Sequence, residues 1–366
     1  FTKENQYIVK ELMKIKWNRP IKVLIIDDSA FIRQFLSRIF HETEDFQVLA
    51  AVSDPTKAVK ILKEESPDVI TLDVEMPNMD GLEFLRYLMR FKPIPVVMIS
   101  SWTSQNSEIA LKALSLGAVD YVAKPTVGLR EGMAECRNVI ITKVKAAATA
   151  RIKTKPLRRD PLPSLPKPEP SGLTKATDKV IAIGASTGGT VALTEIFKDL
   201  RPETPGIIII QHMPKMFTAS FASSLQQVSR LRVSEARGGE VLTTGQALLV
   251  PGGKSLTVKK SGAKYVVEVG PSIEHSIYNP SIDYTLFSVA KAAGPNAMGI
   301  ILTGMGDDGA KGLKAMREWG AYTIAQDEES SVIYGMPKKA WENQGAIKQA
   351  PLSEIAGEIH RWAGIS

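Results

Sequence analysis

Cysteine is almost absent from this chain of 366 residues, in which Cys136 is the single example. One cysteine cannot form an intramolecular disulfide or supply a cysteine-based zinc site, and such sparing use is typical of a reducing compartment. Long apolar runs are missing as well, because none approaches the roughly 20 residues that a helix needs to span a bilayer. We therefore expect neither a disulfide scaffold nor membrane insertion.

Residues 1–20 contain no apolar core of the signal-peptide kind. We expect them to form an N-terminal extension to the folded part of the chain. The remaining length is sufficient for two domains, each with its own core. Apolar residues make up 44% of the chain and charged residues 23%, which is typical of a globular protein.

The predicted domains also lack an excess of positive charge. The net charge is +7, but eight basic and only two acidic residues lie between Lys143 and Pro170. This one segment carries nearly the whole excess, so neither flanking region is typical of a nucleic-acid-binding groove. Six prolines between Lys155 and Pro170 prevent a helix or a central strand there. We interpret residues 146–177 as a basic, extended, Pro-rich linker between two domains.

Short apolar runs alternate with amphipathic stretches before this linker. Alternation of this kind predicts a five-stranded, doubly wound parallel sheet over residues 21–145, with a flavodoxin-like arrangement. The expected strands are 23–26, 48–52, 69–72, 96–99 and 121–123, and clear helical stretches are 31–40 and 81–91.

Polar residues stand where four of these strands end. Asp27 and Asp28 follow the first strand and Asp73 the third, while Ser100 and Lys124 end the fourth and fifth. The carboxyl ends of parallel strands meet at one sheet edge, where ligands bind. Three carboxylates at that edge are suited to Mg²⁺, so Asp27, Asp28 and Asp73 are the predicted metal ligands.

The same constellation predicts phosphorylation of Asp73. Lys124 would then pair with the acyl phosphate, Ser100 would donate a hydrogen bond to it, and Tyr121 would reorient when Ser100 moves. The alternative is a flavodoxin-like domain whose acids only cap strand ends, and four matching positions argue against it. Residues 21–141 resemble a response-regulator receiver domain, which implies a phosphorylation switch that requires Mg²⁺.

Alternation resumes after the linker and predicts a second α/β domain over residues 178–366, doubly wound with a largely parallel sheet. No helix-turn-helix pattern is present, which argues against DNA as the target. The expected strands are 180–184, 207–210, 297–302 and 322–325, with further β-structure over 247–270. Two helices are expected to end near residues 200 and 229, and three more to span 283–293, 310–319 and 353–362. Ser353 is the expected N-cap of the last helix.

Ser186 lies in Gly184-Ala185-Ser186-Thr187-Gly188, which fits the G-x-S-x-G turn that presents a nucleophilic serine. A Gly-rich phosphate or dinucleotide turn fits these residues equally well. A base would decide between them, and His212 ends the strand expected beside that of Ser186. His41 and His360 lie in helices and His275 in a loop, where solvated or packing roles are expected.

A third group for a triad is available in Thr303-Gly304-Met305-Gly306-Asp307-Asp308-Gly309, which ends another strand. The order Ser, His, acid differs from that of the α/β-hydrolases, but triads are defined by geometry and not by order. From the residues alone, either Asp307 or Asp308 could be the acid.

The whole chain resembles the chemotaxis response-regulator protein-glutamate methylesterase and glutamine deamidase (CheB) family. The motifs that carry the resemblance are 185–189, 211–213, 279–283, 303–309, 326–330 and 334–337. The resemblance implies a triad of Ser186, His212 and Asp308, with Asp307 outside it. It also implies backbone oxyanion donors at Met305 and Thr187 and no cofactor in the catalytic domain.

The implied function is a phosphorylation-activated serine hydrolase that removes methyl groups from chemoreceptor glutamates and deamidates receptor glutamines. Its implied partners are methyl-accepting chemoreceptors and a chemotaxis histidine kinase, with no nucleic acid, in the cytoplasm at receptor arrays. The rival interpretation is a receiver-controlled output that binds a nucleotide without catalysis. That interpretation predicts an acid about 20 residues beyond the glycines. Asp199 is only 13 residues past Ser186, and Glu203 precedes a strand instead of ending one. Neither residue is a good match for the acid that a nucleotide-binding site would need.

Overall fold

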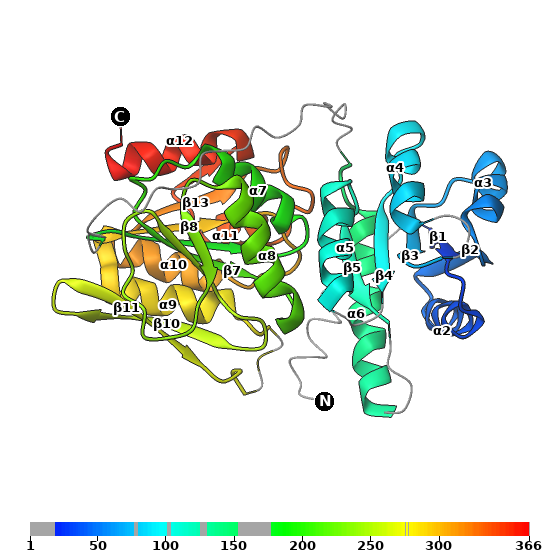
Figure 1. Ribbon diagram of the computed structural model, residues 1–366, viewed down its shortest axis with the longest axis horizontal. Coiled ribbons are helices and arrows are strands. Elements are labelled where there is room, and N and C mark those ends of the chain that lie inside the picture. The colour runs from blue at the N-terminus through cyan, green and yellow to red at the C-terminus, as the bar shows by residue number, and fades with distance from the viewer. Residues whose placement is uncertain are drawn as a thin grey trace. The chain divides into compact units, whose positions relative to one another are not determined.

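The structure is a computed structural model that describes residues 19–76, 80–100, 104–124, 130–152, 177–274, 276 and 278–365. The chain divides into two compact units, Phe1–Leu157 and Arg158–Ser366 (Figure 1). Residues 1–18 and 153–176 lie outside the described part, so the predicted extension, linker and domain boundaries stay predictions. No helix in the described ranges is long and apolar enough to cross a bilayer.

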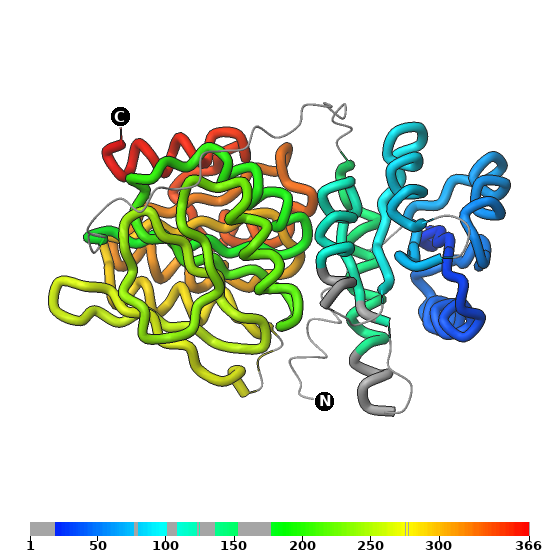
Figure 2. Tube along the Cα trace, in the orientation of Figure 1, coloured from blue at the N-terminus to red at the C-terminus, as the bar shows by residue number. Residues whose placement is uncertain are grey.

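The first unit is a five-stranded parallel sheet with the order β2-β1-β3-β4-β5, as predicted. The order reverses between β1 and β3, so their carboxyl ends flank the crevice where doubly wound folds bind ligands. The elements, which Figure 2 lets the reader follow along the chain, are β1 (Ile21–Ile26), α2 (Ala30–His41), β2 (Phe46–Val52), α3 (Pro55–Glu64), β3 (Val69–Asp73), α4 (Gly81–Phe91), β4 (Val96–Ser100), α5 (Ser104–Ser115), β5 (Asp120–Ala123) and α6 (Arg130–Ala148).

Local sequence explains where these elements begin. Strands β3 and β4 are buried at every residue, because helices cover both faces of a parallel sheet. Three of the helices start at a residue whose side chain accepts a backbone N–H of the first turn, namely Ser29, Asp54 and Asp80. Such caps satisfy amides that have no partner inside the helix.

The second unit is a seven-stranded sheet with the order β14-β13-β12-β6-β7-β9-β8, in which every pairing is parallel. An antiparallel hairpin of β10 and β11 stands apart from it. The elements are β6 (Val180–Ala185), α7 (Gly189–Asp199), β7 (Gly206–Gln211), α8 (Lys215–Val228), β8 (Arg232–Glu235), β9 (Gln246–Leu249), β10 (Ser255–Ser261), β11 (Lys264–Gly270), α9 (Ile282–Ala293), η1 (Gly294–Asn296), β12 (Ala297–Ile301), α10 (Ala310–Glu318), β13 (Tyr322–Gln326), α11 (Met336–Glu342), β14 (Lys348–Ala350) and α12 (Leu352–Ala363).

The strand order places three loops at one position. Strand β6 lies between β7 and β12, and the chain winds outward from it in both directions. Helix α7 contacts α8 and α12, whereas α10 contacts α9 and α11, as expected of a doubly wound unit. The segments that follow β6, β7 and β12 therefore converge at the switch point, where the predicted triad residues lie.

The predicted Ser353 cap is wrong. Helix α12 begins at Leu352, directly after Pro351, and Ser353 is an exposed residue inside its first turn. The Leu352 N–H is satisfied by the Ser330 hydroxyl at 2.9 Å, which comes from a distant part of the chain. A tertiary contact thus replaces the local cap. Strands β8 and β14 and helix α11 are short elements that the sequence does not predict.

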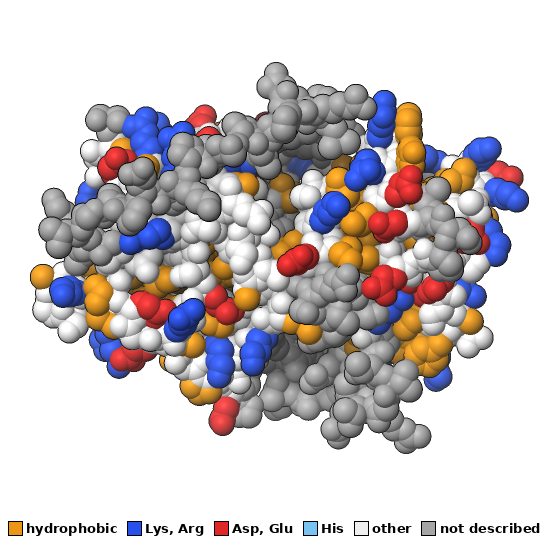
Figure 3. Space-filling view, viewed as in Figure 1, with side chains coloured by type: hydrophobic (Ala, Val, Ile, Leu, Met, Phe, Trp, Pro, Cys, Tyr) orange, Lys and Arg blue, Asp and Glu red, His pale blue; other side chains and the backbone are white. Residues whose placement is uncertain are grey.

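The surface carries charges of both signs. On the face that Figure 3 shows, basic and acidic side chains of the described residues are interspersed, and neither sign gathers into a continuous patch.

Candidate active site and phosphoacceptor site

The predicted carboxylates of the first unit come together at the switch point between β1 and β3. One ligand atom from each of Asp27, Asp28 and Asp73 lies within 4.8 Å of the others. Asp27 and Asp73 are each only 1% exposed, whereas Asp28 is exposed. The Lys124 ammonium lies 2.6 Å from Asp73 Oδ2 and 3.1 Å from Asp27 Oδ2. The three predicted carboxylates and the Lys124 ammonium therefore form one cluster.

This cluster holds more negative charge than its surroundings neutralise. Burial raises the pKa of Asp73 to about 7, and the charge of Asp27 adds to this, although Lys124 opposes both. Burial also raises the pKa of Asp27. A hard divalent cation prefers carboxylate oxygens and would relieve this repulsion, so the residues fit Mg²⁺.

The predicted switch residues are buried in the two strands that follow β3 in the sheet. Ser100 ends β4 and is 5% exposed, and Tyr121 of β5 is 6% exposed. Lys143 of α6, which the sequence does not single out, lies over the Tyr121 ring at 4.9 Å from its centroid. Its ammonium also donates to the Tyr121 carbonyl at 2.9 Å and to Asp120 Oδ1 at 2.7 Å. Pro125 lies outside the described residues.

In the second unit, Ser186 occupies the turn between β6 and α7. Its N–H donates to the Thr303 carbonyl at 3.1 Å, and its own carbonyl accepts the Gly189 N–H at 2.8 Å. Gly188 has a φ of +79°, a left-handed conformation that glycine adopts without strain. The sharp turn leaves Ser186 half-buried at the N-terminus of α7, where helical amides favour negative charge.

His212 directly follows β7, which pairs with β6. Its N–H donates to the Ala185 carbonyl at 3.0 Å, and its ring Nε2 lies 2.8 Å from Asp308 Oδ2. Within the described residues, this is the one hydrogen bond to the imidazole. The neutral tautomer with its proton on Nε2 therefore leaves Nδ1 as the ring nitrogen that can accept a proton.

Asp308 is placed at the N-terminus of helix α9 as well as beside the base. Oδ2 accepts the Ile282 N–H at 2.8 Å, and Oδ1 accepts the Asp283 N–H at 2.9 Å and the Ser281 hydroxyl at 3.2 Å. Burial alone would raise the pKa of Asp308, but the His212 bond and these amides outweigh it and hold the pKa below its usual range. The carboxylate therefore stays ionised. Its neighbour Asp307 is exposed.

The two predicted oxyanion donors lie in the loop 303–306 and in the turn that carries Ser186. A Cβ placed on Gly304 would lie 2.7 Å from Ser186 Cβ, so the loop 303–306 packs directly against the serine. The Met305 N–H has no acceptor among the described residues and is available to a ligand. Thr187, the other predicted donor, is 8% exposed and lies next to Ser186 at the start of the α7 turn.

The structure adds site residues that sequence reasoning missed. The Gln211 amide donates to the carbonyls of Ser186 at 2.9 Å and His212 at 3.2 Å and so joins the two segments. The Tyr278 ring stacks on the His212 imidazole. Both residues lie in or beside motifs that the sequence singled out, but only tertiary contacts reveal what they touch.

Two of the other histidines have hydrogen-bond partners of their own. His41 Nδ1 is 2.6 Å from the Ser37 carbonyl on the surface of α2. His360 Nε2 accepts the Arg201 N–H at 3.3 Å between α12 and the end of α7. Both have the local packing roles that were predicted, and His275 lies outside the described residues.

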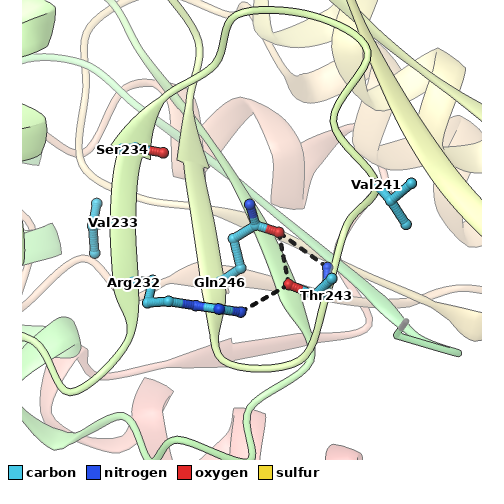
Figure 4. A pocket seen from close by; sticks show the side chains of 6 residues that line it. All are labelled: Arg232, Val233, Ser234, Val241, Thr243 and Gln246. Atoms are coloured by element: carbon cyan, nitrogen blue, oxygen red, sulfur yellow. Dashed lines mark hydrogen bonds between the residues drawn. The ribbon is translucent and has the colours of Figure 1, made fainter. Parts of the chain in front are cut away.

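A separate pocket of about 350 Å³ lies at the edge of the sheet (Figure 4). Its polar groups bond to one another, since Arg232 donates to the Thr243 hydroxyl at 3.1 Å and Gln246 Oε1 accepts that hydroxyl at 2.9 Å. Strand β8 borders the pocket, and β7 and β9 separate β8 from the strand that leads to Ser186. The pocket is therefore not part of the Ser186 site.

Comparisons with known proteins match both units. Residues 181–359 match the family described as CheB methylesterase, and residues 23–134 match the response regulator receiver domain. The two matches lie in the order that the sequence motifs suggested.

Similar proteins extend along nearly the whole chain. Protein-glutamate methylesterase/protein-glutamine glutaminase 1 of Geobacter metallireducens is 46% identical over 349 residues, covering 94% of this chain and 96% of its own. The protein named protein-glutamate methylesterase/protein-glutamine glutaminase in Chromohalobacter salexigens is 46% identical over 349 residues, covering 95% and 98%. The Escherichia coli K12 protein of that name is 44% identical over 342 residues, covering 93% and 96%. With matches of this extent, the chain belongs to the family of CheB methylesterases that carry an N-terminal receiver domain.

Proposed function

We propose that this protein is a phosphorylation-activated serine hydrolase that demethylates glutamate methyl esters on chemoreceptors and deamidates specific receptor glutamines. The observation that carries the proposal is the 2.8 Å contact of the His212 imidazole with Asp308, on a segment whose His212 N–H also bonds to the Ala185 carbonyl next to Ser186. This arrangement is a nucleophile, a general base and a group that orients the base.

Acylation begins when Ser186 Oγ attacks the ester carbonyl carbon and its proton passes to His212 Nδ1. Asp308 keeps the Nε2 proton in place and stabilises the imidazolium that forms, without itself accepting a proton. The intermediate then collapses, the bond to the methoxy oxygen breaks, and Nδ1 returns its proton to the departing methanol. The product is an acyl-enzyme on Ser186.

Backbone donors hold the oxyanion in this step. The Met305 and Thr187 N–H groups are assigned this role because one belongs to the loop packed against Ser186 and the other directly follows it. Water then attacks the acyl-enzyme with His212 as base and releases glutamate. A glutamine enters the same path and loses ammonia in place of methanol, and no step needs a cofactor in this unit.

Asp73 is the proposed phosphoacceptor. Receiver domains generally use Mg²⁺, and Asp27, Asp28 and Asp73 are the groups that would hold it here. When bound, the cation neutralises phosphoryl charge during transfer. Lys124 pairs with the acyl phosphate, and Ser100 and the buried Tyr121 relay the change.

The proposed partners follow from these two chemistries. A receiver requires a phosphodonor, here a chemotaxis histidine kinase, and the esterase requires methylated chemoreceptors as substrate. The site of action is then the cytoplasm at receptor arrays. A nucleotide-binding output is not favoured, since the exposed Asp199 ends helix α7 and does not stand at a strand end.

Methanol release from methylated chemoreceptor, measured with and without a phosphodonor, tests the proposal. Ser186→Ala should lower kcat by on the order of 10⁶, the usual effect of losing a triad nucleophile. Ser223→Ala, at an exposed serine of α8, is the matched control and should keep full activity. Residual activity of Ser186→Ala within tenfold of wild type contradicts the assignment.

A further inference from the structure

The imidazole of His212 lies flat against the ring of Tyr278. The ring centroids are 4.5 Å apart and the planes differ by 3°. Tyr278 belongs to the segment between β11 and α9, whereas His212 follows β7, so this contact is tertiary. The mechanism proposed above gives Tyr278 no role.

We propose that Tyr278 is a positioning residue for the general base. Its ring fixes the plane of the His212 imidazole and stabilises the imidazolium that forms as Ser186 attacks. The inference rests on the proposed serine hydrolase mechanism and adds a residue to it.

The imidazole needs such support because it has few other anchors. Within the described residues, the ring has one hydrogen bond, from Nε2 to Asp308. In the proposed mechanism Nδ1 must stay available to Ser186, so it cannot serve as a second anchor. A ring held at one nitrogen can rock about that bond, which would move Nδ1 relative to Ser186 Oγ. A parallel ring at 4.5 Å opposes this motion, because tilting either ring loses contact area or causes a clash.

The contact also changes in strength during the reaction. A neutral imidazole on a phenol is an ordinary aromatic pair, but an imidazolium is a cation above a ring face, which the ring quadrupole attracts. Interactions that strengthen only on the way to the transition state raise kcat and leave ground-state binding unchanged. Tyr278 should therefore affect kcat more than KM.

Tyr278 is itself held firmly enough for this role. Its N–H donates to the Ser276 hydroxyl at 3.2 Å, and its carbonyl accepts that hydroxyl at 2.8 Å. The Asn279 carbonyl accepts the Gly253 N–H at 3.0 Å, which ties the next residue to a separate loop. Burial, with the charges of Asp308 and Asp307, raises the pKa of the phenol, so the ring stays neutral.

The phenol also reaches the loop that carries the oxyanion donor. A Cβ on Gly306 would lie 2.7 Å from the Tyr278 hydroxyl oxygen, and Gly306 has a φ of +92°. One side chain therefore contacts both the base and the loop next to Met305. By touching both, the Tyr278 side chain would hold the imidazole and the loop 303–306 at a fixed distance from each other.

The test compares Tyr278→Leu, Tyr278→Met and Tyr278→Phe in the full-length phosphorylated protein. Leu and Met keep apolar volume without an aromatic face, whereas Phe keeps the face and removes only the hydroxyl. Tyr284→Leu is the matched control, because that tyrosine is 42% exposed on α9. Two rates are measured: methanol release from methylated chemoreceptor, and covalent labelling of Ser186 by a fluorophosphonate, which needs the activated serine but not the receptor.

We expect Leu and Met to lower kcat and the labelling rate by roughly ten- to a hundredfold, with KM within twofold of wild type. Phe should recover most of that loss, and Tyr284→Leu should match wild type. The proposal is overturned if Leu and Met keep wild-type rates, if Phe is as slow as Leu, or if the loss lies in KM. Wild-type protein that labels at Ser186 but releases no methanol would count against the proposed function alone, and the labelling comparison would still decide the role of Tyr278.

Discussion

At the scale of single residues, adjacent aspartates have opposite environments. Asp308 is buried and accepts hydrogen bonds from His212 and from two amides of α9, whereas Asp307 is exposed. Asparagine at 308 can present an amide N–H to the imidazole and so favour the wrong tautomer, which costs on the order of 10⁴ in kcat in a comparable triad. Asp308→Asn should therefore be severe in a methanol-release assay, and Asp307→Asn should stay within a few-fold of wild type. The reverse ranking would show that the acid is misassigned.

Asp73 differs from the other acids of its cluster because it is the last residue of β3 and lies nearer to Lys124, at 2.6 Å compared with 3.1 Å for Asp27. We expect Asp73→Asn to gain no phosphoryl mass with acetyl phosphate and Mg²⁺ and to show no activation, because the nucleophilic carboxylate is gone. Intact-protein mass spectrometry measures the first outcome. Asp54→Asn is the control, since asparagine caps α3 as well as aspartate does. Undiminished labelling of Asp73→Asn contradicts the assignment.

The half-buried carboxylate of Asp283 makes stability depend on pH. Burial, together with the charge of Asp308, raises its pKa to about 6 from 3.8, although the Gly312 N–H opposes this with a bond of 2.6 Å. The folded protein thus binds more protons than the unfolded chain between these values. Stability from this group falls as pH rises through the window, and the whole cost is present above about pH 6.

Asp283→Asn removes that dependence and keeps an acceptor for Gly312. Relative to wild type, the variant should gain up to about 3 kcal/mol in free energy of unfolding between pH 4 and pH 7, since each pKa unit corresponds to about 1.4 kcal/mol. Urea unfolding followed by tryptophan fluorescence measures this, because three of the five tryptophans, Trp319, Trp341 and Trp362, belong to the second unit. A pH-independent difference between the two proteins would rule out this role for Asp283.

At the scale of elements, the sequence pattern predicts the strands that are long apolar runs and misses the short strands and the short helix α11. Apolar runs that become buried strands, such as β6 and β7, are visible because every residue except the terminal Gln211 is apolar or small. Strand β8 has four residues at the sheet edge, and its Val233 N–H is satisfied by the Gln226 side chain instead of another strand. Strand β14 has three residues, and α11 begins beside Pro337. Such elements depend on neighbours that a sequence pattern does not show.

The candidate site divides in the same way. Ser186, His212 and Asp308 were predictable because each ends or follows a strand within a recognisable motif. Their supports were not, because Gln211 and Tyr278 act through a carbonyl or a ring face supplied by another segment. A residue type at one position says little about which distant surface it meets.

Close packing of the β12 loop against the β6 turn leads to an element-scale prediction. A Cβ on Gly304 would lie 2.7 Å from Ser186 Cβ and 2.4 Å from Met336 Sδ, so Gly304→Ala must separate the loop from the serine. We expect kcat for methanol release to fall by roughly ten- to a hundredfold. Gly357→Ala is the control, since its nearest neighbour would be Arg361 Nη1 at 3.5 Å, and it should keep activity and gain about 0.5–1 kcal/mol of helix stability. Equal activity of the two variants would contradict the proposed role of the loop.

At the scale of the whole molecule, the chain joins a receiver unit with a proposed phosphoacceptor to a methylesterase unit through the predicted proline-rich linker. The two sites lie in separate compact units, so a change at Asp73 can affect Ser186 only if the units interact. A Pro-rich spacer keeps them at high effective concentration without fusing them. Interfaces between domains of one chain are typically modest and polar, so a local change of charge can reset them.

We therefore predict that the unphosphorylated receiver restrains the hydrolase and that phosphorylation relieves the restraint. Deleting residues 1–170 should give a folded esterase, because the second unit has its own buried core around β6, β7 and β12. Its methanol release should be faster than that of the unphosphorylated full-length protein and should not respond to a phosphodonor, since Asp73 is absent. Initial rates on the same methylated receptor provide the comparison, with circular dichroism as the check on folding. A folded fragment that is slower than the unphosphorylated full-length protein would mean that the receiver is an activator, and inhibition by the receiver would then be the wrong explanation of the two-unit architecture.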